Sequence, residues 1–497
     1  MRSPTQPSHV STGGVAASPV ITLDAPIRTA ISGRPGVFTA ATIILCVIVP
    51  GLLGGWQVVG HAGTKGSLPL QIAITVWAGL RLSKLWSRGE PRPFAVVFWL
   101  YVYVWLGLAS MLQVIHQEAP YLIAISPSAY EQGQVIILLG LALLEIGHLF
   151  PARKEIQMLT NRQIVGSRVT VLVAFVLITA PLWYHLLGGF HVLFSSRQEL
   201  AATVLGRAVS TQKSNLATGG IEVAFATVPT FVALYLVIVT RQYKLWHNSR
   251  LVLILLVIVA LVLDNPISLP RFWTGTILTA LVFAIPLVQR RAAAMRIVIA
   301  GMIFICIVLF PYAAYFRLSS GFKPPPGVVR TLTTKPDYDS FEMIYTGIQY
   351  TRDVGFRYGN QALADIFFFV PRALWSSKAP DTGALLGVYY NLPNTNLSAP
   401  LWIEAYIDFG YFGVIAIFFV YGLIMRRADD RFVKGDSPFA QFAIPLLAGY
   451  SCILLRGSLL AAMARLAVML GIIWLVSKRG STDTQCSLDQ ASVSHIC

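Results

Sequence analysis

The chain has 497 residues, of which 55% are hydrophobic and only 12% are charged. A soluble chain carries about a quarter charged residues, because its surface must meet water. This composition excludes a soluble globular protein and favours a fold whose outer surface faces lipid. The formal net charge of +16 does not indicate nucleic-acid binding, because the basic residues stand in short connectors between apolar runs.

Residues 1–36 are rich in Ser, Thr, Pro and Gly, which predicts a disordered tail. The apolar run that follows is too long and too far along the chain for a cleaved signal peptide, so we expect an anchored helix. We expect about 12 transmembrane helices, most near the ~20 residues needed to cross hydrocarbon, within 37–315 and 402–477. The expected spans are 38–58, 67–82, 94–115, 132–150, 168–190, 221–240, 250–264, 271–289, 296–315, 402–425, 437–456 and 459–477.

Basic residues predict the orientation of these spans. More than half of the 38 lysines and arginines fall in the N-terminal tail, in every second connector and in residues 478–497. The positive-inside rule makes these segments cytoplasmic, and an even number of spans places both termini there. The five cysteines have neither the spacing of a zinc site nor that of a disulfide framework.

The connector 316–401 lies on the opposite side and is too rich in apolar residues for a disordered linker. Residues 341–350 are apolar at helical spacing, and residues 362–371 are dense in aromatic side chains that need burial. We expect short amphipathic helices that lie on the outer membrane face or dip into it and roof a cavity. The predicted fold class is an all-α polytopic membrane protein with a large structured extracytoplasmic loop.

Outward arginines are the first candidates for chemistry. A guanidinium group stays protonated, and its planar fork fits phosphate oxygens. An enzyme that handles lipid pyrophosphates needs such groups at the outer leaflet. The candidates are Arg207, Arg317, Arg352 and Arg372. Alternatively, they pair with aspartates and only fold the loop; the possible partners are Asp337, Asp339, Asp353 and Asp365.

Two carboxylates are the second candidates. Glu404 and Asp408 are four residues apart, which places both on one helix face at the outer membrane edge. A carboxylate there is costly unless it is paired or lines water, so it is a candidate site residue. A general base that activates a sugar hydroxyl would need such a group. The alternative is a structural ion pair with Arg372 or Arg456, more so for Asp408.

The run Glu404-x-x-x-Asp408-Phe-Gly410-x-x-Gly413 opens a late helix directly after the long outward loop. In this position it resembles the oligosaccharide repeat-unit polymerases, the Wzy-type O-antigen and exopolysaccharide polymerases. The block 369–383, in which ten residues separate Arg372 from Gly383, is similar to their second large periplasmic loop. The other basic outward loop departs from the pattern, because eleven residues separate Arg207 from Gly219, and this leaves the role of Arg207 open.

The resemblance implies a GT-C-like membrane glycosyltransferase in the bacterial inner membrane that uses no metal, cofactor or nucleotide sugar. Such an enzyme joins undecaprenyl-pyrophosphate-linked repeat units at the outer face of that membrane. It implies catalytic roles for Glu404, Asp408 and Arg372, with the outward arginines holding the pyrophosphate. The implied partners are the lipid-linked oligosaccharide, membrane lipid, a chain-length regulator and a flippase.

Two other functions compete with the polymerase. An O-antigen-type ligase shares this architecture but uses an outward histidine, and none lies within 394–413. A flippase or transporter should line a central path with charged residues, and the expected spans hold few: Glu145, Asp264 and Arg465. We expect Arg465 to face into the bundle, where it could reach the carboxylates or a lipid phosphate.

Overall fold

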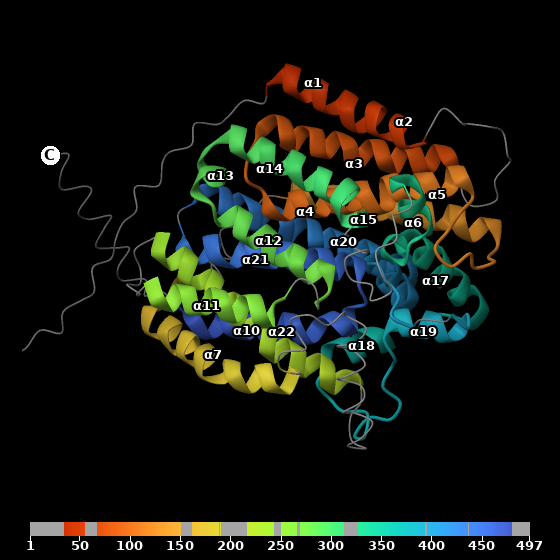
Figure 1. Ribbon diagram of the computed structural model, residues 1–497. Coiled ribbons are helices and arrows are strands. Elements are labelled where there is room, and N and C mark those ends of the chain that lie inside the picture. Colours follow the sequence, from red (N-terminus) through yellow and green to blue (C-terminus); the bar gives the residue numbers. More distant parts are fainter. Residues whose placement is uncertain are drawn as a thin grey trace, which may run out of the picture.

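The computed structural model describes residues 34–54, 67–150, 162–187, 189, 216–242, 250–265, 269–312, 327–392, 395–435 and 437–479. Within these ranges the chain is almost entirely helical (Figure 1). The long helical segments are α1–η1–α2 (Pro35–Ile43, Ile44–Ile48, Val49–Gly54), α3 (Leu68–Arg88), α4–η2–α5 (Pro93–Tyr101, Val102–Ala109, Ser110–His116), α6 (Pro127–Leu149), α7 (Gly166–Leu187), α10 (Leu216–Gln242), α11 (Arg250–Leu263), α12 (Arg271–Ala284), α14–η4–α15 (Ala292–Phe304, Ile305–Leu309, Phe310–Tyr312), α20 (Leu401–Lys434), α21 (Pro438–Arg456) and α22 (Leu459–Val476). The shorter elements are α13 (Pro286–Arg290), α16 (Val328–Thr334), η6 (Pro336–Tyr338), α17 (Ser340–Val354), α18 (Asn360–Ile366), α19 (Thr382–Tyr389), and strands β1 (Arg162–Ile164) and β2 (Ser477–Arg479).

Every expected span coincides with helix in the part of the chain that the structure describes. Nine of the helices there are long and apolar enough to cross a membrane, and α11 and α12 are shorter, with 14 residues each. The chain therefore has the fold of an all-α membrane protein. One exception to the expected all-helical structure is the short antiparallel pair of β1 and β2. A second difference concerns a helix end. Helix α20 extends beyond the expected span 402–425 and includes basic residues for which the sequence predicts a connector: Arg426, Arg427, Arg431 and Lys434.

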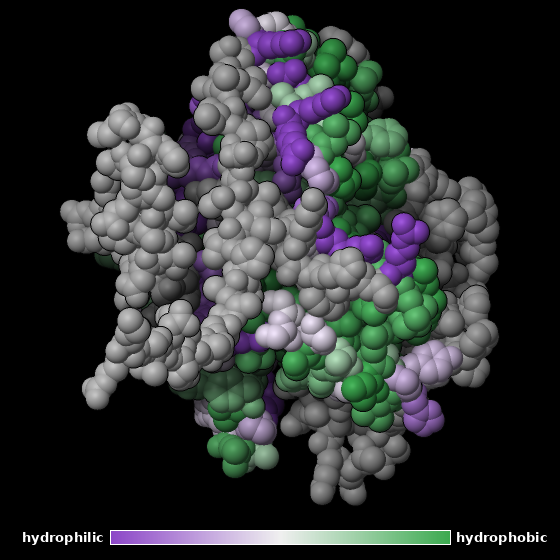
Figure 2. Space-filling model, turned by 90° about the vertical axis from the view of Figure 1, so that its left-hand side faces the viewer, coloured by the Kyte–Doolittle hydropathy of each residue, from purple (hydrophilic) through white to green (hydrophobic). Residues whose placement is uncertain are grey.

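The helices pack around the segment Pro93–His116, whose apolar stretch is completely buried. Six helices form a second core beside it, namely α7, α10, α11, α12, α21 and α22. The short helices α17, α18 and α19 gather at the right-hand ends of the long helices in Figure 1, whereas α13 lies at their left-hand ends. Figure 2 looks onto the left-hand end and shows hydrophilic side chains over it, next to hydrophobic flanks. The left-hand end of the bundle therefore presents hydrophilic side chains.

Ion pairs and a helix cap fasten the α13 end. Arg92 Nη1 lies 2.8 Å from Asp430 Oδ1, which joins the start of α4 to α20. The buried Asp429 carboxylate accepts hydrogen bonds of 2.9 Å from the backbone N–H groups of Phe94 and Ala95. A carboxylate at this position satisfies N–H groups that have no partner within a helix and interacts favourably with the helix dipole.

Glycines allow α6 and α20 to cross at close range. A Cβ atom at Gly422 would collide with the backbone carbonyl of Leu144, and one at Gly147 would collide with that of Phe419. Small residues at such a crossing let two membrane helices pack backbone to backbone. The crossing positions the first turns of α20, which carry Glu404 and Asp408.

We expect Gly422→Leu to lower the free energy of unfolding by about 1–3 kcal/mol, because the added side chain forces α6 and α20 apart. Thermal unfolding of the detergent-solubilised protein measures the effect. Gly301→Leu is the matched control, since a Cβ atom at Gly301 meets no atom within 4 Å. Equal unfolding temperatures for the two variants would contradict the close crossing.

Candidate active site

Glu404 lies at the junction of three helices. Its Oε2 atom accepts a 2.6 Å hydrogen bond from the Thr382 hydroxyl at the start of α19. Its Oε1 atom accepts a 3.0 Å hydrogen bond from the backbone N–H of Leu459 at the start of α22. Both carboxylate oxygens therefore have donors, and the buried side chain joins α19 and α22 to α20. No arginine pairs with it among the described residues.

Asp408 lies one helical turn further along α20 and faces a different element. It accepts hydrogen bonds from the backbone N–H groups of Gln361, at 3.2 Å, and Ala362, at 2.7 Å, so it caps the first turn of α18. The guanidinium of Arg357 lies close enough to attract the Asp408 carboxylate, and its buried Nε has no hydrogen-bond partner. The alternative, an ion pair of Asp408 with Arg372 or Arg456, is not formed, because both arginines have other partners.

Helix α20 breaks at Gly410, two residues after Asp408. Gly410 has φ 60° and ψ −145°, a conformation that is essentially restricted to glycine. A Cβ atom at Gly413 would collide with the carbonyl of Ala405, so the break also requires glycine at the second position of the motif. The Gly410-x-x-Gly413 spacing is therefore explained by the backbone of α20.

A pocket of about 490 Å³ opens beside this break. Asp408 contributes the one charged side chain among its lining residues, which are Phe356, Tyr358, Asp408, Phe409, Phe412, Gly413 and Ala416. Binding sites for small molecules typically combine such apolar walls with a few placed polar groups. The apolar walls of the pocket can accept an apolar ligand, and Asp408, which is buried and hydrogen-bonded to α18, contributes to the lining.

Asp365 is a further acidic group near the pocket, and the sequence suggested it only as an ion-pair partner. It is buried in α18, and its carboxyl group has neither a hydrogen bond nor an ion pair in the described part of the chain. Burial and the neighbouring carboxylates of Asp408 and Asp381 raise its pKa well above the ordinary value. Its spacing from Gln361, one helical turn earlier on the same face of α18, is a signal that could have identified it.

Asp381 and Lys378 complete the charged surroundings. The Asp381 carboxylate caps α19 by accepting a 3.0 Å hydrogen bond from the backbone N–H of Ala384, while burial raises its pKa. Burial lowers the pKa of Lys378, and the nearby Arg372 lowers it further. The carboxylates around α18 thus outnumber the cations that face them, which favours holding a proton there.

Arg352 connects to the pocket through a chain of polar and aromatic contacts. Its Nη1 donates to the hydroxyls of Ser126 and Ser128, at 2.9 and 2.8 Å, and its Nη2 donates to Gln132 Oε1 at 2.6 Å. Gln132 in turn donates a 2.7 Å hydrogen bond to the Tyr406 hydroxyl. The Tyr406 ring lies 5.6 Å from the ring of Phe356, which lines the pocket. Arg352 does not pair with an aspartate and remains exposed.

The other expected arginines have different positions. Arg372 is exposed and donates to the backbone carbonyls of Lys378 and Ala379, at 2.6 and 3.0 Å, so it closes a loop outside the pocket lining. Arg207 and Arg317 lie outside the described residues. A chain of contacts thus leads from Arg352 to Phe356, which lines the pocket together with Asp408, whereas Arg372 does not line it.

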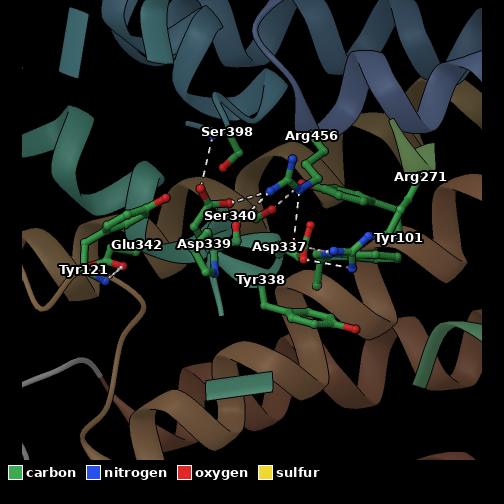
Figure 3. Close-up of polar contacts among 12 residues, drawn as sticks. Tyr101, Tyr121, Arg271, Asp337, Tyr338, Asp339, Ser340, Glu342, Ser398 and Arg456 are labelled. Carbon is green, nitrogen blue, oxygen red and sulfur yellow. Dashed lines mark hydrogen bonds and ion pairs between the residues drawn. The ribbon is translucent and has the colours of Figure 1, made fainter. Parts of the chain in front are cut away.

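Loop aspartates do pair with arginines, but with arginines of the bundle (Figure 3). Arg456 Nη2 lies 3.0 Å from Asp339 Oδ1, and Arg271 Nη1 lies 3.0 Å from Asp337 Oδ2. The Arg456 guanidinium also lies over the ring of Phe272, 4.6 Å from its centroid. These contacts fasten the loop to α12 and α21, a structural role.

Three further charged residues lie inside the bundle, namely Arg465, Asp264 and Glu145. Arg465 faces inward, as expected, with its guanidinium 5.8 Å from the ring centroid of Trp273. Asp264 accepts a 2.9 Å hydrogen bond from the Trp273 indole N–H and attracts Arg465 electrostatically. Glu145 pairs with Arg81 toward the α13 end. These groups occupy separate places, and no continuous charged path joins them among the described side chains.

In the described ranges, no group of three or more His, Cys, Asp or Glu side chains is placed to hold a metal ion. Glu404, Asp408 and Asp381 are instead engaged with backbone N–H groups and a hydroxyl. No protein-family model, no curated protein and no solved structure matches the chain. A functional assignment therefore depends on the chemistry of the site itself.

Proposed function

We propose that the chain is a polysaccharide polymerase that joins undecaprenyl-pyrophosphate-linked oligosaccharide repeat units at the outer face of the bacterial inner membrane. In this proposal about 12 helices cross the membrane, because α3, α11 and α12 join the nine that meet the criteria of length and hydropathy. The basic α13 end and both termini face the cytoplasm, which agrees with the positive-inside rule. The α17–α19 end then faces outward.

One observation supports this proposal most strongly: an apolar pocket ends on a carboxylate and connects to an exposed arginine. The substrate of such a polymerase has an apolar polyprenyl chain, a pyrophosphate and a glycan. The aromatic walls of the pocket would bind part of the polyprenyl chain, and the planar guanidinium group of Arg352 would bind the pyrophosphate. Asp408 lines the same pocket, and in this proposal the sugar is placed beside its carboxylate.

The reaction follows from these positions. A hydroxyl of the acceptor glycan attacks the anomeric carbon of the donor glycan, while the bond from that carbon to the pyrophosphate oxygen breaks. Asp408 receives the hydroxyl proton as general base, with Glu404 holding the first turn of α20 in place. Arg352 stabilises the negative charge on the departing polyprenyl pyrophosphate. The products are the elongated lipid-linked glycan and the free lipid carrier.

Replacing Arg352 by alanine is expected to reduce the rate of polymerisation by roughly 10²–10³-fold, because the charge on the leaving pyrophosphate loses a fixed donor. Gel analysis of the glycan products of the purified protein measures this rate. Arg372→Ala, which alters an exposed arginine outside the pocket lining, is expected to reduce the rate less. Arg330→Ala serves as the control for an exposed arginine at the same end of the bundle. A larger loss for Arg372→Ala than for Arg352→Ala would move the pyrophosphate site to the loop.

A further inference from the structure

Helix α18 and the segment between α18 and α19 carry large apolar side chains that are exposed on the protein. We call these residues the apolar knuckle: Leu363, Ile366, Phe367, Phe369 and Leu374, with exposed fractions of 48%, 63%, 43%, 60% and 82%. The sequence predicts that the aromatic residues of this segment need burial, at the membrane face or under it, and the chain itself does not bury Phe367 and Phe369. Contiguous exposed apolar patches on proteins mark surfaces that another molecule or a membrane covers.

Hydrogen bonds hold the knuckle in one shape. Lys378 is buried, and its ammonium group donates to the carbonyls of Phe367, Phe368 and Val370 at 3.0, 2.8 and 3.1 Å. Arg372 adds hydrogen bonds to two further carbonyls of the same segment. The two cations thus donate hydrogen bonds to five backbone carbonyl groups of a loop that has little regular structure. These hydrogen bonds hold the backbone in a conformation in which the apolar side chains are exposed.

The knuckle continues the membrane-facing surface of α20. Gly359, at the start of α18, packs on the ring of Phe409, since a Cβ atom there would lie 2.8 Å from Phe409 Cζ. Phe409 and Phe412 are both exposed on the segment of α20 that is apolar enough to span a membrane. At this contact the start of α18, whose later residues belong to the knuckle, lies directly on an exposed apolar side chain of α20.

The charged residues near the knuckle favour a lipid surface as the molecule that covers it. Residues 366–380 contain no acidic side chain, and their two cations are Arg372 and Lys378. Arg372 is exposed beside the apolar tip, where a guanidinium can meet a phosphate headgroup. Apolar side chains flanked by cations are the composition of segments that insert into the membrane interface.

We propose that the apolar knuckle inserts into the outer leaflet of the membrane, with phospholipid acyl chains around Phe369 and Leu374 and headgroup phosphates at Arg372. The inserted knuckle anchors α18 at the lipid–water boundary and so keeps the pocket beside Asp408 open toward lipid. This inference does not depend on polymerase activity, because it concerns where the loop lies.

Fluorescence quenching tests the insertion in the full chain, reconstituted in vesicles of phosphatidylethanolamine and phosphatidylglycerol. A fluorophore is attached through Leu374→Cys or Phe369→Cys, and labelling of the unmutated protein gives the background from its own cysteines. Ile258→Cys in α11 is the reference inside the membrane, and Thr395→Cys in the loop is the reference in water; both positions are exposed on the protein.

Nitroxides on the acyl chains are expected to quench the labels at positions 374 and 369 severalfold more than the label at position 395. Iodide in the water is expected to quench the labels at 374 and 369 severalfold less than the label at 395. If both quenchers act on the label at position 374 as they act on the label at position 395, the proposal is overturned. Protection from iodide that depends on the protein-to-lipid ratio, without acyl-chain quenching, would also overturn it and would indicate that a second copy of the chain covers the knuckle.

Discussion

Replacing Arg456 by methionine is expected to lower the free energy of unfolding by about 3–5 kcal/mol, the largest effect on stability that the structure predicts. Asp339 is only 1% exposed, so the substitution leaves a buried carboxylate without its counter-charge. Burial raises the pKa of Asp339 and Arg456 opposes this, so the variant would have to bury a charge or take up a proton. Denaturant unfolding of the detergent-solubilised protein measures the loss.

Two controls separate the ion pair from a general effect of removing an arginine. Arg330→Met removes an exposed arginine and is expected to change stability by less than about 0.5 kcal/mol. The double variant Arg456→Met with Asp339→Asn is expected to recover part of the loss, because the neutral amide no longer requires a counter-charge. Wild-type stability of the single Arg456 variant would show that the loop does not depend on this pair.

Replacing Asp408 by asparagine is expected to reduce polymerisation by about 10²–10⁴-fold, the range typical of a lost general base. The amide is nearly the same size but does not accept a proton from the sugar hydroxyl. Because Asp408 also caps α18, part of the loss could come from local unfolding. The rate must therefore be compared with a variant that loses a similar cap elsewhere.

Asp429→Asn is that matched control. Asp429 lies in the same helix α20, is buried, and accepts hydrogen bonds from two backbone N–H groups at the start of α4. It lies far along α20 from the pocket. Similar losses of stability in both variants, with loss of activity only in the Asp408 variant, would support the catalytic role. Equal activities would leave Asp408 as a helix cap alone.

Periodicity and hydropathy were sufficient to predict the helices and the helical content of the long loop. A helix was expected at residues 341–350 and lies within α17 (Ser340–Val354). Apolar runs specify membrane helices directly, because backbone groups in lipid must be satisfied within the helix. Helix ends were less predictable, since α20 continues through the basic residues that were placed in a connector.

The site was predictable only in part, because its geometry depends on contacts between distant segments. Spacing placed Glu404 and Asp408 on one face of a helix, and both are buried at the loop. The break at Gly410, which forms the pocket, depends on a backbone conformation that the motif does not specify by itself. Arg352 was identified by charge and compartment, but its link to the pocket runs through Gln132, in a helix that the sequence did not connect with the site.

Charge pairing was the least predictable feature. The sequence offered the loop aspartates as partners for outward arginines, and two of them pair with Arg271 and Arg456 at helix ends of the bundle instead. Asp365 has neither of these partners and lies among other carboxylates. One-dimensional spacing cannot decide between such arrangements, because each pair is formed by the packing of the loop on the bundle.

The most direct test of the central claim is polymerisation by the purified wild-type protein in detergent, given an undecaprenyl-pyrophosphate-linked repeat unit and no nucleotide sugar. The account predicts a ladder of glycans that differ by one repeat unit, with release of the lipid pyrophosphate. Absence of a ladder from an authentic substrate would contradict the polymerase. Transfer of a finished glycan to another acceptor would then indicate a ligase, and movement of the lipid-linked unit across a liposome membrane would indicate a flippase.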